Sequence, residues 1–163
     1  DKLLQLESLW GRSSKRLIPD LTRMAVILLA AEQYAESESY YWRLLEIQHL
    51  TMGDENIESA RTLDALGNIY FVQELYVTAA QLYQMSLVIL ENCHAQKEPI
   101  FETVLCQLLW ALRLQNSAEA KQVEKRLAQH RNGQSRSVVA EAISFRPSLC
   151  QRGNRAQNEA KSA

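Results

Sequence analysis

The stretch TLDALGNIY, residues 62–70, decides the fold of this 163-residue chain. Its apolar side chains recur at the spacing of one helix face, at Leu63, Leu66, Ile69 and Tyr70. Gly67 stands among them, although a glycine inside a helix costs roughly 1 kcal/mol relative to alanine. We infer that the helix needs a residue without a side chain there, so that a second helix can approach it closely.

The rest of the chain is also helical in pattern. Five glycines and three prolines are few for a protein with many turns, and no segment alternates with a period of two. The spacing of apolar residues predicts helices at about 2–10, 19–31, 34–50, 57–72, 75–92, 100–114 and 117–130. We therefore expect an all-α protein.

The chain resembles itself when it is shifted by a constant offset of 42. QYAESESYYWRLLEI, residues 33–47, aligns with LYVTAAQLYQMSLVI, residues 75–89, and superposes Tyr41 on Tyr83. The offset also carries small residues onto small residues, since Ala25 corresponds to Gly67 and Ser37 to Ala79. A repeat period of 20–50 residues is typical of solenoids. We expect Gly67 and Ala79 to face each other across a helical hairpin.

The second repeat carries a recognisable motif. Leu63-x2-Leu66-Gly67-x2-Tyr70, followed by Ala79-x3-Tyr83, resembles the tetratricopeptide pattern W-x2-L-G-x2-Y…A-x3-F. The period of 42 resembles the longer-repeat subgroup typified by kinesin light chain, whose pattern is met by MGDENIESARTLDALGNIY except at Asn56 and Ile57, where that family has His-Pro. The resemblance implies a right-handed α-solenoid of about three helix-turn-helix repeats.

The repeats suggest a domain organisation in three parts. Residues 1–16 would form an N-terminal capping helix or the remnant of a preceding repeat. The solenoid would occupy residues 17–130, with repeats at about 18–50, 57–93 and 100–130. Residues 131–163 would be a basic tail, either disordered or with a short helix near 137–145.

Composition and charge argue against several classes of partner. The net charge is −1, but the charges are unevenly distributed. Residues 1–130 hold 12 basic and 17 acidic residues, whereas residues 131–163 hold 6 basic and 2 acidic residues. We expect no nucleic-acid ligand, and no apolar run approaches the roughly 20 residues that span a bilayer. Three cysteines at unrelated spacing form no disulfide framework and favour a reducing, cytoplasmic location.

Enzymatic and metal chemistry are not indicated. The sequence has no nucleophile motif, no glycine-rich phosphate loop and no HExxH. His49, His94 and His130 lie near predicted helix ends, where a cation is favourable, and no ligands are spaced for a metal. We expect no catalytic site and no cofactor.

The family resemblance implies a peptide-binding site instead. In such repeats the first helix of each hairpin lines a concave groove. The positions that would face it here are Val26, Leu29, Arg61, Asp64, Asn68, Phe71, Trp110 and Arg113. Among them Asn68 would bond the backbone of an extended peptide, four apolar side chains would form pockets, and the arginines would meet an acidic group. The lysine-rich clamp of chaperone-binding repeats is not reproduced, because Asp64 and Cys106 replace its basic residues.

Two functions of different classes follow. The chain would be an interaction module, an adaptor or scaffold that binds a peptide segment of another protein in the groove. Alternatively it would be an assembly subunit whose surface, with Trp10 and Trp42, forms a homodimer or joins a larger complex. A third hypothesis has the tail around Phe145 docked in the groove until a partner displaces it.

Overall fold

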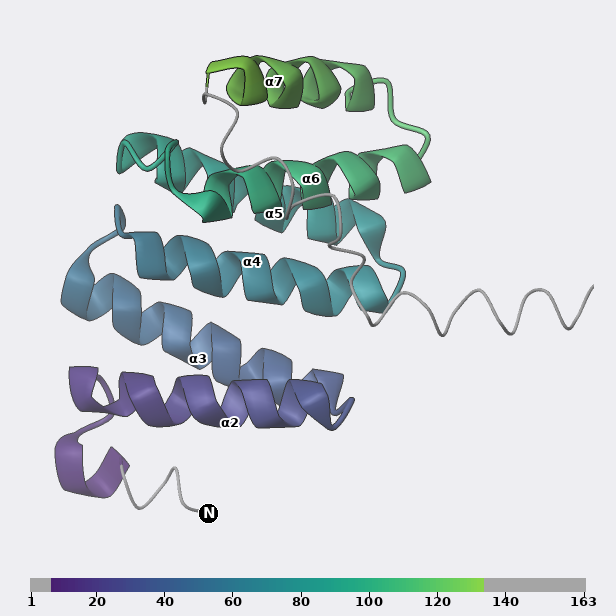
Figure 1. The fold of residues 1–163 in the computed structure, drawn as a ribbon. Coiled ribbons are helices and arrows are strands. Elements are labelled where there is room, and N and C mark those ends of the chain that lie inside the picture. The colour runs from purple at the N-terminus through teal and green to yellow at the C-terminus, as the bar shows by residue number, and fades with distance from the viewer. Residues whose placement is uncertain (1–6, 134–163) are drawn as a thin grey trace, which may run out of the picture.

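The computed structural model describes residues 7–133, and these residues form helices joined by short turns (Figure 1). Residues 7–10 are helical, in agreement with the end of the predicted first helix. The elements that follow are η1 (Lys15–Leu17), α2 (Ile18–Ala30), α3 (Tyr34–Met52), α4 (Ile57–Val72), α5 (Tyr76–Asn92), α6 (Pro99–Leu114) and α7 (Ala120–Gly133). The short helix predicted near 137–145 and the rest of the tail from residue 134 lie outside this description.

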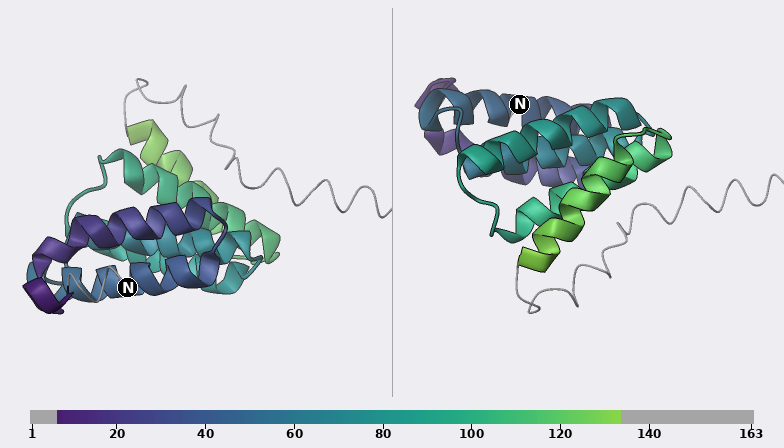
Figure 2. Two further views of the ribbon diagram at one scale, coloured as in Figure 1. Left: turned by 90° about the horizontal axis from the view of Figure 1, so that it is seen from below. Right: turned by 90° about the horizontal axis from the view of Figure 1, so that it is seen from above.

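The helices form three hairpins that stack in chain order. Helix α2 packs against α3, α4 against α5 and α6 against α7, while α3–α4 and α5–α6 contacts join successive hairpins. Figure 1 shows the stack from α2 to α7, and Figure 2 shows it from either end. The predicted all-α solenoid is confirmed. Its first helices also meet directly, since α4 contacts α6.

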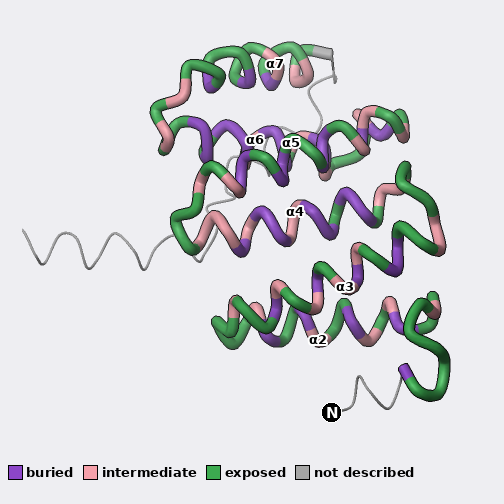
Figure 3. The backbone as a smooth tube through the Cα atoms, turned by 180° about the vertical axis from the view of Figure 1, so that it is seen from behind, coloured by how far each residue is buried: buried purple, intermediate pink, exposed green. Residues whose placement is uncertain are grey.

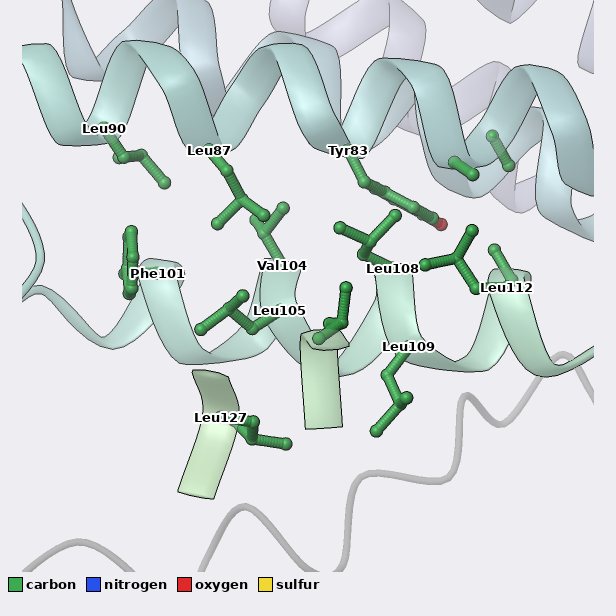
Figure 4. Packing of buried hydrophobic residues seen from close by; sticks show 14 of the residues in the cluster. Tyr83, Leu87, Leu90, Phe101, Val104, Leu105, Leu108, Leu109, Leu112 and Leu127 are labelled. Carbon is green, nitrogen blue, oxygen red and sulfur yellow. The ribbon is translucent and has the colours of Figure 1, made fainter. Parts of the chain in front are cut away.

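The core is a set of buried stripes between neighbouring helices, as the tube in Figure 3 shows. One cluster of buried residues joins α2, α3 and α4, and a second runs from α4 to α7. In the second cluster Tyr83, Leu87 and Leu90 of α5 point toward α6 (Figure 4). Each hairpin therefore buries its apolar faces only by stacking on its neighbours, as expected of a repeat protein.

Gly67 is buried because the ring of Tyr83 lies against it. A β-carbon built on Gly67 would lie 2.5 Å from Cε1 and 2.7 Å from Cδ1 of Tyr83. The closest neighbour is thus this ring rather than Ala79, the residue predicted to face the glycine. One hairpin earlier, the Ser37 hydroxyl donates a buried 2.8 Å hydrogen bond to the carbonyl oxygen of Ala25. Both hairpins close at small residues, but by different contacts.

The turns inside the three hairpins have the same backbone conformation, although their residues differ. Glu32, Glu74 and Asn116 have φ of 60°, 63° and 54°, and they occupy equivalent positions in the three repeats. In each turn the next residue donates a 2.9 Å hydrogen bond to the carbonyl oxygen five residues earlier. This closes the helix end in the manner of a Schellman motif, although glycine is the usual residue at the left-handed position.

Helix starts follow local chemistry. Prolines occupy the first turn of α2 and α6, where the missing N–H has no helical partner. Asn56 caps α4, since its side-chain oxygen accepts from the N–H groups of Glu58 at 2.8 Å and Ser59 at 3.2 Å. The departure from the family's His-Pro therefore preserves the start of this helix.

The first described residues are held against α3. Arg43 donates to Glu7 Oε1 at 3.1 Å and to the carbonyl oxygen of Arg12 at 2.8 Å. Glu7 is buried, so this ion pair is sheltered from solvent. The contacts fix the segment before α2 to the first hairpin.

Candidate functional site

The predicted groove residues lie on α2, α4 and α6, the first helix of each hairpin. Three of them, Val26, Asn68 and Trp110, occupy the same position in successive repeats. Val26 is 51% exposed and Trp110 is 58% exposed, so two apolar side chains remain open to solvent. Asn68 between them is half-buried.

Asn68 connects three helices. Its side-chain oxygen accepts a 2.9 Å hydrogen bond from the hydroxyl of Tyr83 and a 2.8 Å hydrogen bond from Nε2 of Gln107. The sequence predicted that the amide group of Asn68 would bond a peptide backbone, and in the protein the oxygen of that group joins α4 to α5 and α6. No acceptor among residues 7–133 takes the amide nitrogen of Asn68.

Asp64 lies one helical turn before Asn68 and is largely withdrawn from solvent. Burial raises its pKa to about 7, against the smaller lowering effects of Gln107 and of the Arg61 charge. Its Oδ1 is closed to solvent and has no hydrogen-bond partner in the described part of the chain. Burial also raises the pKa of Tyr41, and the nearby Asp64 charge adds to that effect.

Gln107 is the residue that inspection of the sequence missed. Its nitrogen bonds Asn68, while its Oε1 is buried and has no donor among the described residues. Asp64 and Gln107 thus bring two unsatisfied acceptor oxygens to the contact between α4 and α6. The sequence did single out this residue, since Gln107 is the one side-chain amide within the apolar run VLCQLLWAL of residues 104–112.

The other two apolar candidates are packed rather than open. Phe71 makes an edge contact with Tyr76, with ring centroids 5.4 Å apart, and lies against the second core cluster. Leu29 is half-buried against the first cluster. Both side chains therefore keep only part of their surface open to solvent.

Both predicted arginines already have carboxylate partners. Arg61 lies 3.5 Å from Glu58 on the exposed side of α4. Arg113 lies 2.7 Å from Glu124 and lines a depression of about 470 Å³ between α6 and α7. Arg113 is thus placed at the α6–α7 contact, away from the α4–α6 contact that holds Asp64.

Comparison with known proteins agrees with this architecture. Residues 18–92, which include α2 to α5, match the tetratricopeptide repeat family. Residues 18–92 therefore consist of tetratricopeptide repeats. Such repeats are generally protein–protein interaction modules. No curated protein sequence matches the chain.

The fold of this repeat protein is also found in a solved structure, the crystal structure of BtubC (BKLC) from P. vanneervenii. The two share 18% sequence identity with a TM-score of 0.70, over 82% of this chain and 56% of that one. At this identity the likeness shows the fold alone. The chain spans little more than half of the length of that relative.

Two further observations limit the chemistry of the described residues. No helix among them is long and apolar enough to cross a membrane. No three of their histidine, cysteine, aspartate and glutamate side chains are grouped so as to hold a metal ion.

Proposed function

We propose that this repeat protein is an interaction module, and that the solenoid of residues 17–130 binds a peptide segment of another protein. The binding surface is the first-helix face, which we define as Val26, Asp64, Asn68, Gln107 and Trp110. The proposal is carried by the register of that face, which places Val26, Asn68 and Trp110 at one equivalent position per repeat.

The chemistry of the first-helix face suits an extended peptide. Two exposed apolar side chains flank a centre of polar groups that can both donate and accept hydrogen bonds. A tryptophan open to solvent is a common source of binding free energy once a partner covers it. The free amide nitrogen of Asn68 can donate to a peptide carbonyl.

Peptide selection followed by point substitution tests the proposal. Random-sequence peptides displayed on phage are selected on the whole chain, and the affinities of the recovered peptides are measured by calorimetry. We expect Trp110→Ala and Val26→Asp to weaken binding at least tenfold, because both side chains are exposed and their loss leaves the core intact.

Met85→Ala is the matched control. Met85 is also exposed and apolar, but it lies on α5, a second helix. It should leave the affinity unchanged. Recovered peptides that respond to Met85→Ala and not to Trp110→Ala would place the binding surface elsewhere and refute the proposal, as would the absence of any enriched peptide.

An assembly role is the second candidate, and exposed apolar residues near the N-terminal end favour it. Leu9, Trp10 and Trp42 remain open to solvent there. In that role the surface would pair with a second copy or with another subunit. Light scattering tests the homodimer: a mass that doubles with concentration and reverts in Trp10→Ala supports it, and a monomer at high concentration refutes it.

A further inference from the structure

Two acceptor oxygens at the centre of the first-helix face have no hydrogen-bond donor in the described part of the chain. Asp64 Oδ1 and Gln107 Oε1 are both closed to solvent, and neither has a partner among residues 7–133. Buried acceptors without a donor are uncommon in folded proteins, because each loses its hydrogen bonds to water without compensation. A missing group that satisfies this place must therefore donate.

Asp64 also lacks a counterion. In the part of the chain that the structure describes, no lysine or arginine nitrogen lies within ion-pair distance of its carboxyl group. The arginine whose charge acts on Asp64 is Arg61, and its guanidinium group lies 3.5 Å from Glu58. The groups that influence Asp64 from the surrounding helices are Arg61 on α4, Tyr41 on α3 and Gln107 on α6. Arg61 and Gln107 lower the pKa of Asp64, but the effect of burial is larger than both.

Both Asp64 and Gln107 are only partly buried as whole residues, although the named oxygens are covered. The terminal torsion of a carboxylate is soft, so a small rotation turns Oδ1 toward an approaching donor.

We propose that the peptide bound at the first-helix face carries a lysine or arginine side chain that donates to the Asp64 carboxylate and to Gln107 Oε1. This inference rests on the proposed function and names the chemistry of its ligand. An ammonium or guanidinium group carries only donors, so it can serve both oxygens at once. It also provides the positive charge that a withdrawn carboxylate lacks.

The consequence for pH follows from the same geometry. Since burial raises the pKa of Asp64 to about 7, the free protein holds the carboxyl mostly protonated at pH 6 and mostly ionised at pH 8. A cation binds the ionised form. We therefore expect the affinity for a basic peptide to rise by about tenfold between these pH values.

Parallel selection tests the inference. Random peptides are selected on the native chain and on Asp64→Asn, which keeps the shape of the side chain and removes its charge. We expect a lysine or arginine at one fixed position of the peptides recovered on the native chain and none at that position for the variant. Recovery of the same peptides, without a fixed basic residue, would overturn the inference and leave the proposed function standing. The absence of enrichment on either form would overturn both.

A double-substitution cycle then locates the contact. The basic residue of a recovered lysine peptide is replaced by norleucine, which keeps the carbon chain and removes the ammonium group. The replacement should lower affinity at least tenfold on the native chain and less than twofold on Asp64→Asn. Glu36→Gln is the control, because it removes an exposed carboxylate on α3 and should preserve the tenfold loss. Equal losses on the native chain and on Asp64→Asn would refute the contact.

Discussion

Substitution of Gly67 by alanine measures how closely α4 and α5 approach each other. The added β-carbon would lie 2.5 Å from Cε1, 2.7 Å from Cδ1 and 3.0 Å from Cζ of Tyr83. The ring is fully buried, and its hydroxyl is bonded to Asn68, so it cannot swing into solvent. Overpacking of this kind costs roughly 1–3 kcal/mol, and the severity of the overlap favours the upper half of that range.

Alanine is the better helix former, which offsets the steric cost by about 1 kcal/mol. We therefore expect Gly67→Ala to lower the free energy of unfolding by about 1–2 kcal/mol, measured by urea denaturation followed by circular dichroism. In a Tyr83→Leu background the ring is absent, and the same substitution should be neutral or stabilising. The difference between the two backgrounds isolates the contact from the helix propensity.

A stabilising effect of Gly67→Ala in the native background would refute this account. It would mean that the α4–α5 hairpin has room for a side chain at position 67 and that the glycine has no packing role. An equal destabilisation in both backgrounds would also contradict it, because the cost would then arise from something other than Tyr83.

Three other features can be tested by substitution or deletion. Glu74→Gly should raise the free energy of unfolding by about 1 kcal/mol, measured by urea denaturation, because glycine adopts a left-handed backbone without strain. Asn116→Gly should raise it less, since asparagine tolerates that conformation better than glutamate. Equal gains for the two substitutions would contradict this reasoning. Burial raises the pKa of Asp64 in the folded state to about 7, above the ordinary value of 3.8, so the folded protein binds more protons between these values and loses stability as the pH rises through them. Compared with Asp64→Asn, the native chain should therefore lose about 2 kcal/mol of unfolding free energy between pH 4 and pH 8. The full shift in pKa would give a larger loss, but the side chain keeps part of its contact with solvent. If the difference in unfolding free energy between the two proteins does not change with pH, the carboxyl group is not withdrawn from water. Deletion of residues 134–163 should raise peptide affinity, measured by calorimetry, if the tail competes for the first-helix face, and unchanged affinity would remove that idea.

Local pattern was sufficient to determine the helices of this protein. The apolar spacing predicted α4 at 57–72, and α6, expected at 100–114, begins one residue earlier, at Pro99. The internal repeat also predicted that hairpins would stack, because a repeated amphipathic hairpin cannot bury its apolar faces alone. Gly67 pointed correctly to a close approach of two helices.

Contacts between hairpins could not be determined in this way. Asn68 appeared free to meet a peptide, yet Tyr83 and Gln107 reach its oxygen from positions 15 and 39 residues away. Phe71 has the same pattern as an open groove residue, but Tyr76 beyond the turn covers it.

The sequence by itself determined which residues form helices and that the helices repeat, since both properties depend on neighbours within one or two turns. Only the tertiary structure decided which polar groups are satisfied and which are left over. The local sequence pattern does not distinguish Asp64 and Gln107 from other polar residues of their helices. Their oxygens become unsatisfied acceptors only because the packing of α4 against α6 excludes water from them. Desolvation is a property of the whole packed surface, so no local pattern records it.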